Sequence, residues 1–243
     1  MTAKRFKVTV ICGGALCVLL AAWGVSPAAA ARATCSGAPA TIVGTPGDDR
    51  IWGTSRRDII VARGGIDTVR SRGGKDLICA GKGADHVNGG PASDFIQGGR
   101  GADLLVGQAG TDSILGKGGP DRIIGADGTD GLSGGGDGDH IWGDKPGHAG
   151  TPGRDIIDGD VGEDVIHGGG GPDEIVGQQD DDRLSGGPGN DYLDGKRGND
   201  DLFGNRGEDV LNGGPGINRL DGGGGTDSCN LNDGSGTVIH CEN

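Results

Sequence analysis

The fold is decided by the stretch that reads GGRGADLLVGQAGTDSIL at residues 98–115. Its first half, GGRGADLLV, matches the nonapeptide G-G-x-G-x-D-x-U-x, in which U is a large aliphatic residue, and residues 186–194, GGPGNDYLD, match it as well. The frame runs without a gap from Gly44 to Trp142 as eleven units. It resumes at Gly150 and continues to Asn230 as nine more, so twenty units fill most of the 243 residues. Self-similarity at a fixed period predicts a solenoid.

Two positions of the nonapeptide hardly vary. Position six is Asp in 19 of the twenty units, and its exception, Asn218, keeps a side-chain oxygen. Position eight is Ile, Leu or Val in 19 units, with Cys229 as the exception. Position four is Gly in 16 units. Glycines at positions one, two and four predict a tight turn with positive φ, and the aliphatic side chain is expected to point inward from a short strand.

The nonapeptide therefore predicts a six-residue turn followed by a three-residue strand. Two units make one coil of eighteen residues, and turns on the same edge stack about 4.8 Å apart. The expected fold is an all-β parallel β-roll (β-solenoid) of about ten coils. One degenerate unit precedes the array and one follows it, and these keep Ile42 and Val238 at position eight but lack the acid. They are expected to be caps.

The bulk composition fits a special repeat architecture and no ordinary globular domain. Of the 243 residues, 57 are Gly and only 3% are aromatic, whereas Gly is roughly 7% of average usage. The net charge is −13. An acidic chain repels the phosphates of nucleic acid, so no nucleic acid partner is expected, and cations are favoured.

The position-six aspartates are candidate metal ligands. Carboxylates and turn carbonyls are the hard oxygen ligands that Ca²⁺ prefers. Two carboxylates about 5 Å apart repel by roughly 3 kcal/mol at an effective dielectric constant near 20, and one aliphatic residue in nine makes a thin core. We therefore predict a chain that is largely unfolded without Ca²⁺ and folds as it binds several ions. The candidate ligands are Asp49, Asp58, Asp67, Asp76, Asp85, Asp94, Asp103, Asp112, Asp121, Asp130, Asp139, Asp155, Asp164, Asp173, Asp182, Asp191, Asp200, Asp209 and Asp227.

Over residues 44–230 the units resemble the RTX, or haemolysin-type, calcium-binding nonapeptide repeats. The resemblance implies a right-handed parallel β-roll with rows of Ca²⁺ along both edges, held by the position-six aspartates. Many proteins with these repeats are toxins, proteases or lipases that carry a further large domain and leave the cell through an uncleaved C-terminal signal. This chain offers no segment for such a domain, which puts those activities in doubt.

The first 31 residues are expected to be a secretory signal peptide. Lys4, Arg5 and Lys7 precede an apolar run from about Val8 to Val25, and small residues follow. The alternative is an uncleaved membrane anchor, since about eighteen apolar residues are borderline for a span. Cleavage predicts a secreted, extracellular protein with no membrane span.

Four cysteines remain after that cleavage, which in an exported chain implies disulfides. Cys35 and Cys241 belong to opposite ends of a roll about 48 Å long. The pairs Cys35–Cys79 and Cys229–Cys241 are therefore favoured over crossed pairings, and each would clamp a cap onto the array.

The expected organisation follows from these assignments. It consists of a signal peptide (residues 1–31), an N-terminal cap (32–43), repeats one to eleven (44–142), an inserted surface loop (143–149), repeats twelve to twenty (150–230) and a C-terminal cap (231–243).

No catalytic residues are predicted, and the chain is not expected to be an enzyme. The sequence GLSGG at residues 131–135 matches G-x-S-x-G, but that motif requires a strand-to-helix turn, whereas here it crosses from a strand into the next repeat. The favoured function is a secreted calcium-binding protein with a structural or adhesive role and an extracellular surface or matrix partner. The alternatives are an accessory module of an extracellular hydrolase or toxin system, and a loose acidic cation buffer.

Overall fold

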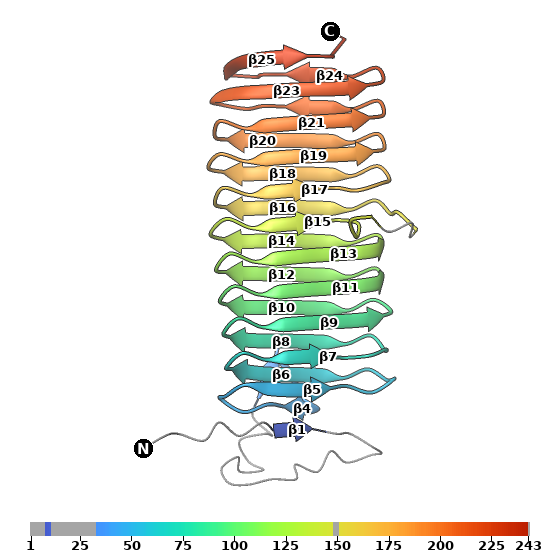
Figure 1. The fold of residues 1–243 in the computed structure, drawn as a ribbon, viewed down its shortest axis with the longest axis vertical. Helices are drawn as coiled ribbons and strands as arrows, with labels where there is room; N and C mark the ends of the chain where they lie inside the picture. The colour runs from blue at the N-terminus through green and yellow to red at the C-terminus, as the bar shows by residue number, and fades with distance from the viewer. Residues whose placement is uncertain (1–7, 11–32, 148–150, 243) are drawn as a thin grey trace.

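In the computed structural model each nonapeptide contributes one strand segment and one turn, and the coils stack into a parallel β-roll (Figure 1). The structure describes residues 8–10, 33–147 and 151–242. Most of the expected signal peptide, residues 148–149 of the expected loop and residue 150 of the expected repeat twelve lie outside these ranges. All regular elements of the described residues are strands, so none of them is a helix able to span a membrane.

Odd-numbered units, of which the last is the degenerate C-terminal unit, supply eleven strands of a twelve-stranded sheet on one face of the roll, and residues 8–10 supply the twelfth. Its strands are β1 (Val8–Val10), β5 (Asp49–Trp52), β7 (Thr68–Arg70), β9 (His86–Pro91), β11 (Leu104–Gly110), β13 (Arg122–Gly128), β15 (His140–Trp142), β17 (Val165–His167), β19 (Arg183–Pro188), β21 (Asp201–Arg206), β23 (Ile217–Gly224) and β25 (Ser235–Ile239).

Even-numbered units supply the opposite sheet of eleven strands. Its strands are β4 (Ile42–Val43), β6 (Ile59–Gly64), β8 (Leu77–Lys82), β10 (Phe95–Arg100), β12 (Ser113–Gly118), β14 (Gly131–Gly136), β16 (Ile156–Val161), β18 (Glu174–Gln179), β20 (Tyr192–Arg197), β22 (Val210–Asn212) and β24 (Ser228–Asn230). A short antiparallel pair, β2 (Thr34–Cys35) and β3 (Ala38–Pro39), lies beside the start of the roll.

The register confirms the eighteen-residue coil. Ile96 of β10 pairs with Ile78 of β8 and with Ile114 of β12, one coil before and one coil after it. The roll has about eleven coils, one more than expected, because both degenerate units form paired strands, β4 and β25.

The core is a single file of aliphatic side chains between the two sheets. Position-eight residues from Ile51 to Leu220 are at most 3% exposed. Their neighbours at positions seven and nine point outward, as the two-residue period of a strand requires; Ile156, at position seven, is 53% exposed. The expected inward aliphatic residue is thereby confirmed.

The turns correct one expectation about glycine. Positive φ occurs at positions two and four, for example at Lys117 (90°) and Gly83 (126°), and not at position one. Glycine at position one serves a steric need instead. A Cβ on Gly107 would lie 2.3 Å from Oδ2 of Asp112 and 2.9 Å from the carbonyl oxygen of Gly125.

Both predicted disulfides are present. Cys35–Cys79 joins the β2–β3 pair to strand β8, with Cα atoms 5.6 Å apart. Cys229–Cys241 joins strand β24 to the end of the chain, with Cα atoms 5.9 Å apart. Each bond thus fastens one end of the roll.

Strand β1 falls within the expected signal peptide. It pairs in parallel with β5, with Val8 opposite Asp49. Cleavage after residue 31 would remove β1 and make β5 the terminal strand of its sheet.

The file of buried side chains gives a test of the packing. Replacing Ile114 by Ala should lower the free energy of unfolding by about 2–5 kcal/mol, because Ile114 is fully buried. Ile156→Ala, at the outward position seven, should cost well under half of that. Urea unfolding in saturating Ca²⁺ measures both, and equal losses would contradict the single-file core.

Candidate metal centre

The position-six aspartates form two straight rows, one along each edge of the roll. Each is at most 6% exposed. The first row contains Asp49, Asp67, Asp85, Asp103, Asp121, Asp139, Asp164, Asp182 and Asp200, and ends at Asn218. The second row contains Asp58, Asp76, Asp94, Asp112, Asp130, Asp155, Asp173, Asp191, Asp209 and Asp227.

Within a row, every aspartate is tied to the next coil by one hydrogen bond. The backbone N–H of Asp94 donates to Oδ1 of Asp112, and that of Asp112 to Oδ1 of Asp130, each at 2.8 Å. The same contact recurs along both rows at 2.7–3.0 Å. One carboxylate oxygen per residue is thereby used in stacking the coils.

The second carboxylate oxygen has no partner. In seventeen of these aspartates, from Asp67 to Asp227, Oδ2 is buried and accepts no hydrogen bond. A buried unsatisfied polar atom costs about 1–3 kcal/mol, and more when it is charged. A roll with seventeen such ionised carboxylates in two rows is therefore not stable unless each unpaired oxygen binds a cation or a proton.

Asn218 shows what lies opposite the unpaired oxygen. Its Oδ1 accepts the N–H of Asp200 at 2.8 Å, as an aspartate would. Its Nδ2 donates to the carbonyl oxygen of Gly214, the position-two residue of the same unit, also at 2.8 Å. An aspartate in the same place would set its Oδ2 against that carbonyl oxygen, and two acceptors facing each other call for a cation between them.

The ends of the rows are closed by other groups. In the first two units Asp49 and Asp58 have partners at Oδ2, since the N–H groups of Thr45 and Thr54 donate to them at 2.5 and 2.6 Å. At the other end Glu242 takes the place of the next aspartate and accepts the N–H of Asp227 at 2.8 Å. The unsatisfied oxygens thus begin at the third unit and continue to Asp227 in the last unit.

Burial raises the pKa of the row carboxyls from Asp67 to Asp209. The pKa of Asp112 rises to about 6 and that of Asp103 to about 7. For Asp94 and Asp173 it rises to about 8. Removal from water is the largest cause, the hydrogen bond from the preceding aspartate opposes it, and for Asp94 and Asp173 the neighbouring carboxylates raise the pKa further. The row carboxylates therefore favour either a bound proton or a bound cation over the free, charged form.

A hard cation fits this oxygen set. Within the described ranges no three His, Cys, Asp or Glu side chains come together closely enough to hold a metal ion. Each ion must therefore take main-chain carbonyls in addition to row carboxylates, a mixture typical of Ca²⁺ sites. The residues that would hold such ions are the seventeen aspartates with an unpaired Oδ2.

The extra loop does not interrupt the rows. The N–H of Asp130 donates to Oδ1 of Asp155 at 2.8 Å, across twenty-five residues instead of eighteen. Gly143 and Asp144 bond to the next coil as positions one and two of a unit, through the carbonyl oxygens of His167 and Gly168. The seven additional residues are thus 145–151, two places later than the expected 143–149, because a glycine fits the frame at either point.

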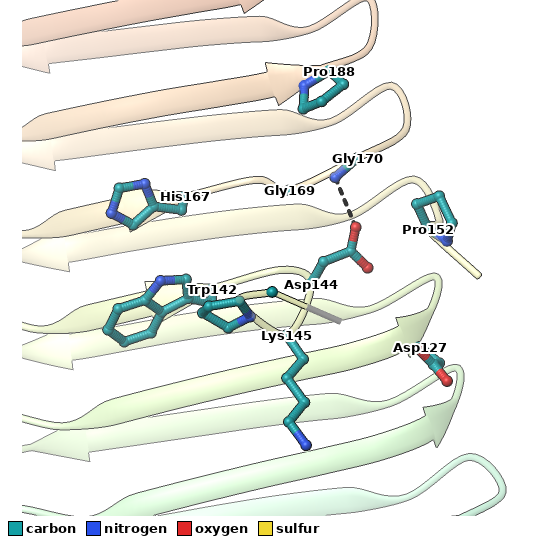
Figure 2. Close-up of a pocket in the computed structure, with 11 residues that line it drawn as sticks. Asp127, Trp142, Asp144, Lys145, Pro152, His167, Gly169, Gly170 and Pro188 are labelled. Carbon is teal, nitrogen blue, oxygen red and sulfur yellow. Dashed lines mark hydrogen bonds between the residues drawn. The ribbon is translucent and has the colours of Figure 1, made fainter. Parts of the chain in front are cut away.

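Beside this loop lies a hollow of about 530 Å³ (Figure 2). One wall is formed by Trp142 and His167, whose ring centroids are 5.8 Å apart and whose planes meet at 21°. The carboxylate of Asp144 accepts the N–H of Gly170 at 2.7 Å and holds the base of the loop against the next turn. Burial lowers the pKa of His167, which favours the neutral imidazole.

A parallel β-roll with buried carboxylate rows at its edges defines a class of cation-binding solenoid. A family model described as the RTX calcium-binding nonapeptide repeat (four copies) matches residues 40–55, 52–87, 80–114, 88–123, 106–141, 149–175, 167–202 and 203–238. The chain therefore belongs to the RTX repeat family, and its repeats bind calcium. No curated protein matches the sequence.

All nineteen predicted ligands lie in the two rows, but they are not equivalent. Asp49 accepts hydrogen bonds from Thr45 at both carboxylate oxygens, and Asp58 accepts two from Thr54 at Oδ2. Sequence reasoning missed Glu242, which extends the second row outside the nonapeptide frame, and Asp144. The spacing from Asp227 to Glu242 is fifteen residues, so no periodic search could have found it.

The raised pKa values predict how acid acts on the metal-free chain. A carboxyl whose folded pKa exceeds its unfolded value stabilises the fold below the unfolded pKa, near 3.9, and this contribution is lost as pH rises through the folded pKa. With folded values of about 6 to 8, the β-sheet signal in chelator should grow as pH falls from about 8 to about 5. Far-UV circular dichroism measures this, and a signal that shrinks on acidification would contradict it.

Proposed function

We propose that this protein is a secreted calcium-binding roll that folds as its rows fill with Ca²⁺ and then serves as a structural or adhesive element outside the cell. The observation that carries the proposal is the set of seventeen buried, unpaired Oδ2 atoms. Ca²⁺ bound between successive turns would supply the missing charge, and binding and folding would be one reaction.

Several features support an extracellular site of action. The basic and apolar start of the sequence is typical of a signal peptide, and the two disulfides suit an oxidising compartment. Calcium sites of moderate affinity are filled outside the cell, where Ca²⁺ is plentiful, so the chain would fold after export. Several ions per chain are proposed, since Asn218 and the Thr45 and Thr54 contacts remove sites only near the ends.

We propose no catalytic activity. The serine of the G-x-S-x-G match, Ser133, lies in strand β14 and donates to Asp160 at 2.7 Å. No histidine contact accompanies this hydrogen bond among the contacts of the described residues, so the arrangement does not support a nucleophile. The regular register of the coils also favours an ordered roll over a loose cation buffer.

Asp112→Asn tests the role of the rows. Asn218 shows that an amide keeps the inter-coil hydrogen bond and gives the second atom a partner. The variant should therefore bind one or two fewer Ca²⁺ ions, and in chelator near pH 5 it should show at least as much β-sheet signal as the parent chain. Equilibrium dialysis with Ca²⁺ counts the ions, and far-UV circular dichroism measures the β-sheet signal.

The matched control is Asp201→Asn, which makes the same charge change at an outward position seven. It should leave the number of bound ions unchanged. An unchanged count for Asp112→Asn, or an equal loss in both variants, would contradict the proposal.

A further inference from the structure

The charge of the chain is divided unevenly along the roll. Residues 44–124 contain 11 Lys and Arg against 10 Asp and Glu, whereas residues 125–243 contain 7 against 25. The first part therefore carries a net charge of +1 and the second part −18. Such a charge asymmetry between two halves of a chain suggests that one of them binds a partner of opposite charge.

Burial sharpens this difference. Nine of the ten acidic residues of the first part belong to the rows and are buried, and only Asp48 lies outside them. Once cations neutralise the rows, the surface of the first part is strongly basic. The second part keeps fifteen acidic residues outside its rows and stays acidic.

Part of this basic surface is hollowed into an open trough of about 560 Å³. It lies along the ends of strands β6, β8, β10 and β12, whose arrowheads stand one above another in Figure 1. Its basic lining residues are Arg63, Lys82, Arg100 and Lys117, and Gly81, Gly99 and Gln97 lie between them.

The register places one cation on each of four successive coils. Arg63 pairs with Gly81, and Gly99 with Lys117. Lys82 pairs with Arg100 on the two coils between them. Among the described residues, Lys82, Arg100 and Lys117 take part in none of the ion pairs. The trough therefore presents a cation about every 4.8 Å along a narrow line.

The shape and spacing select the kind of partner. Gly81 and Gly99 leave the floor of this shallow trough without side chains, so that a single extended chain can lie between the basic residues. Among the described residues no aromatic side chain lines the trough, so nucleobases have nothing to stack on. The phosphates of one strand of B-DNA advance about 3.4 Å per nucleotide along the helix axis while winding around it, whereas these basic residues follow a straight line across stacked coils.

We propose that this trough binds a linear anionic polysaccharide, whose carboxylate or sulfate groups pair with Lys82, Arg100 and Lys117 while Gln97 meets its hydroxyl groups. The proposal rests on the calcium-loaded fold proposed above and names its partner. Calcium has two effects in this scheme. It stacks the coils and so aligns the basic side chains of the trough, and it neutralises the carboxylate rows behind them.

The test is binding of the calcium-loaded protein to heparin, with neutral dextran as the uncharged comparison. Lys82→Glu with Arg100→Glu should weaken heparin binding about tenfold or more and flatten its dependence on salt. Both residues are exposed and neither has positive φ, so the substitutions leave the turns unstrained. Circular dichroism with Ca²⁺ on the same samples separates loss of the trough from loss of calcium-dependent folding.

The matched control is Arg197→Glu with Arg206→Glu, the same charge change at position three in the acidic part of the roll. It should leave heparin binding nearly unchanged. Equal effects of the two pairs would overturn the proposal, as would equal binding to dextran or tighter binding to double-stranded DNA. Light scattering tests whether the protein self-associates. Self-association that is abolished by Lys82→Glu with Arg100→Glu would mean that the trough binds a second copy of the chain, and this result would also overturn the proposal.

Discussion

The structure depends on one contact repeated along both edges of the roll, in which an aspartate N–H donates to Oδ1 of the aspartate one coil further on. This bond sets the distance between coils and fixes the carboxylate in place. The same geometry leaves Oδ2 buried and unpaired. Under the function proposed above, the feature that orders the roll would also make it unstable without a cation, and folding and metal binding would be linked through a single element.

Other features of the chain follow from this contact. Position one must be small because the carboxylate packs against it, and a thin file of aliphatic residues is enough once cations join the turns. Both rows begin where protein groups replace the cation, at Thr45 and Thr54, and the first row ends at Asn218 for the same reason. The disulfides then fasten the terminal coils.

Much of this could be predicted from the sequence, because a nine-residue period places each side chain unambiguously. The inward file, the two rows and both disulfide pairs follow from it. Three features could not be predicted. The position of the loop was ambiguous because Gly143 and Gly150 fit the frame equally, and Glu242 lies outside the period. The reason for glycine at position one depends on a carboxylate orientation that only coordinates reveal.

Small-angle X-ray scattering of the mature chain, first in chelator and then with added Ca²⁺, tests the central claim most directly. We predict a radius of gyration of about 50 Å in chelator at neutral pH, as for an unfolded chain of this length, falling to about 20 Å for a short rod when Ca²⁺ is added. Mg²⁺ should not reproduce the change. A compact rod in chelator that Ca²⁺ leaves unaltered would contradict the account, since the rows would then be stable without a cation.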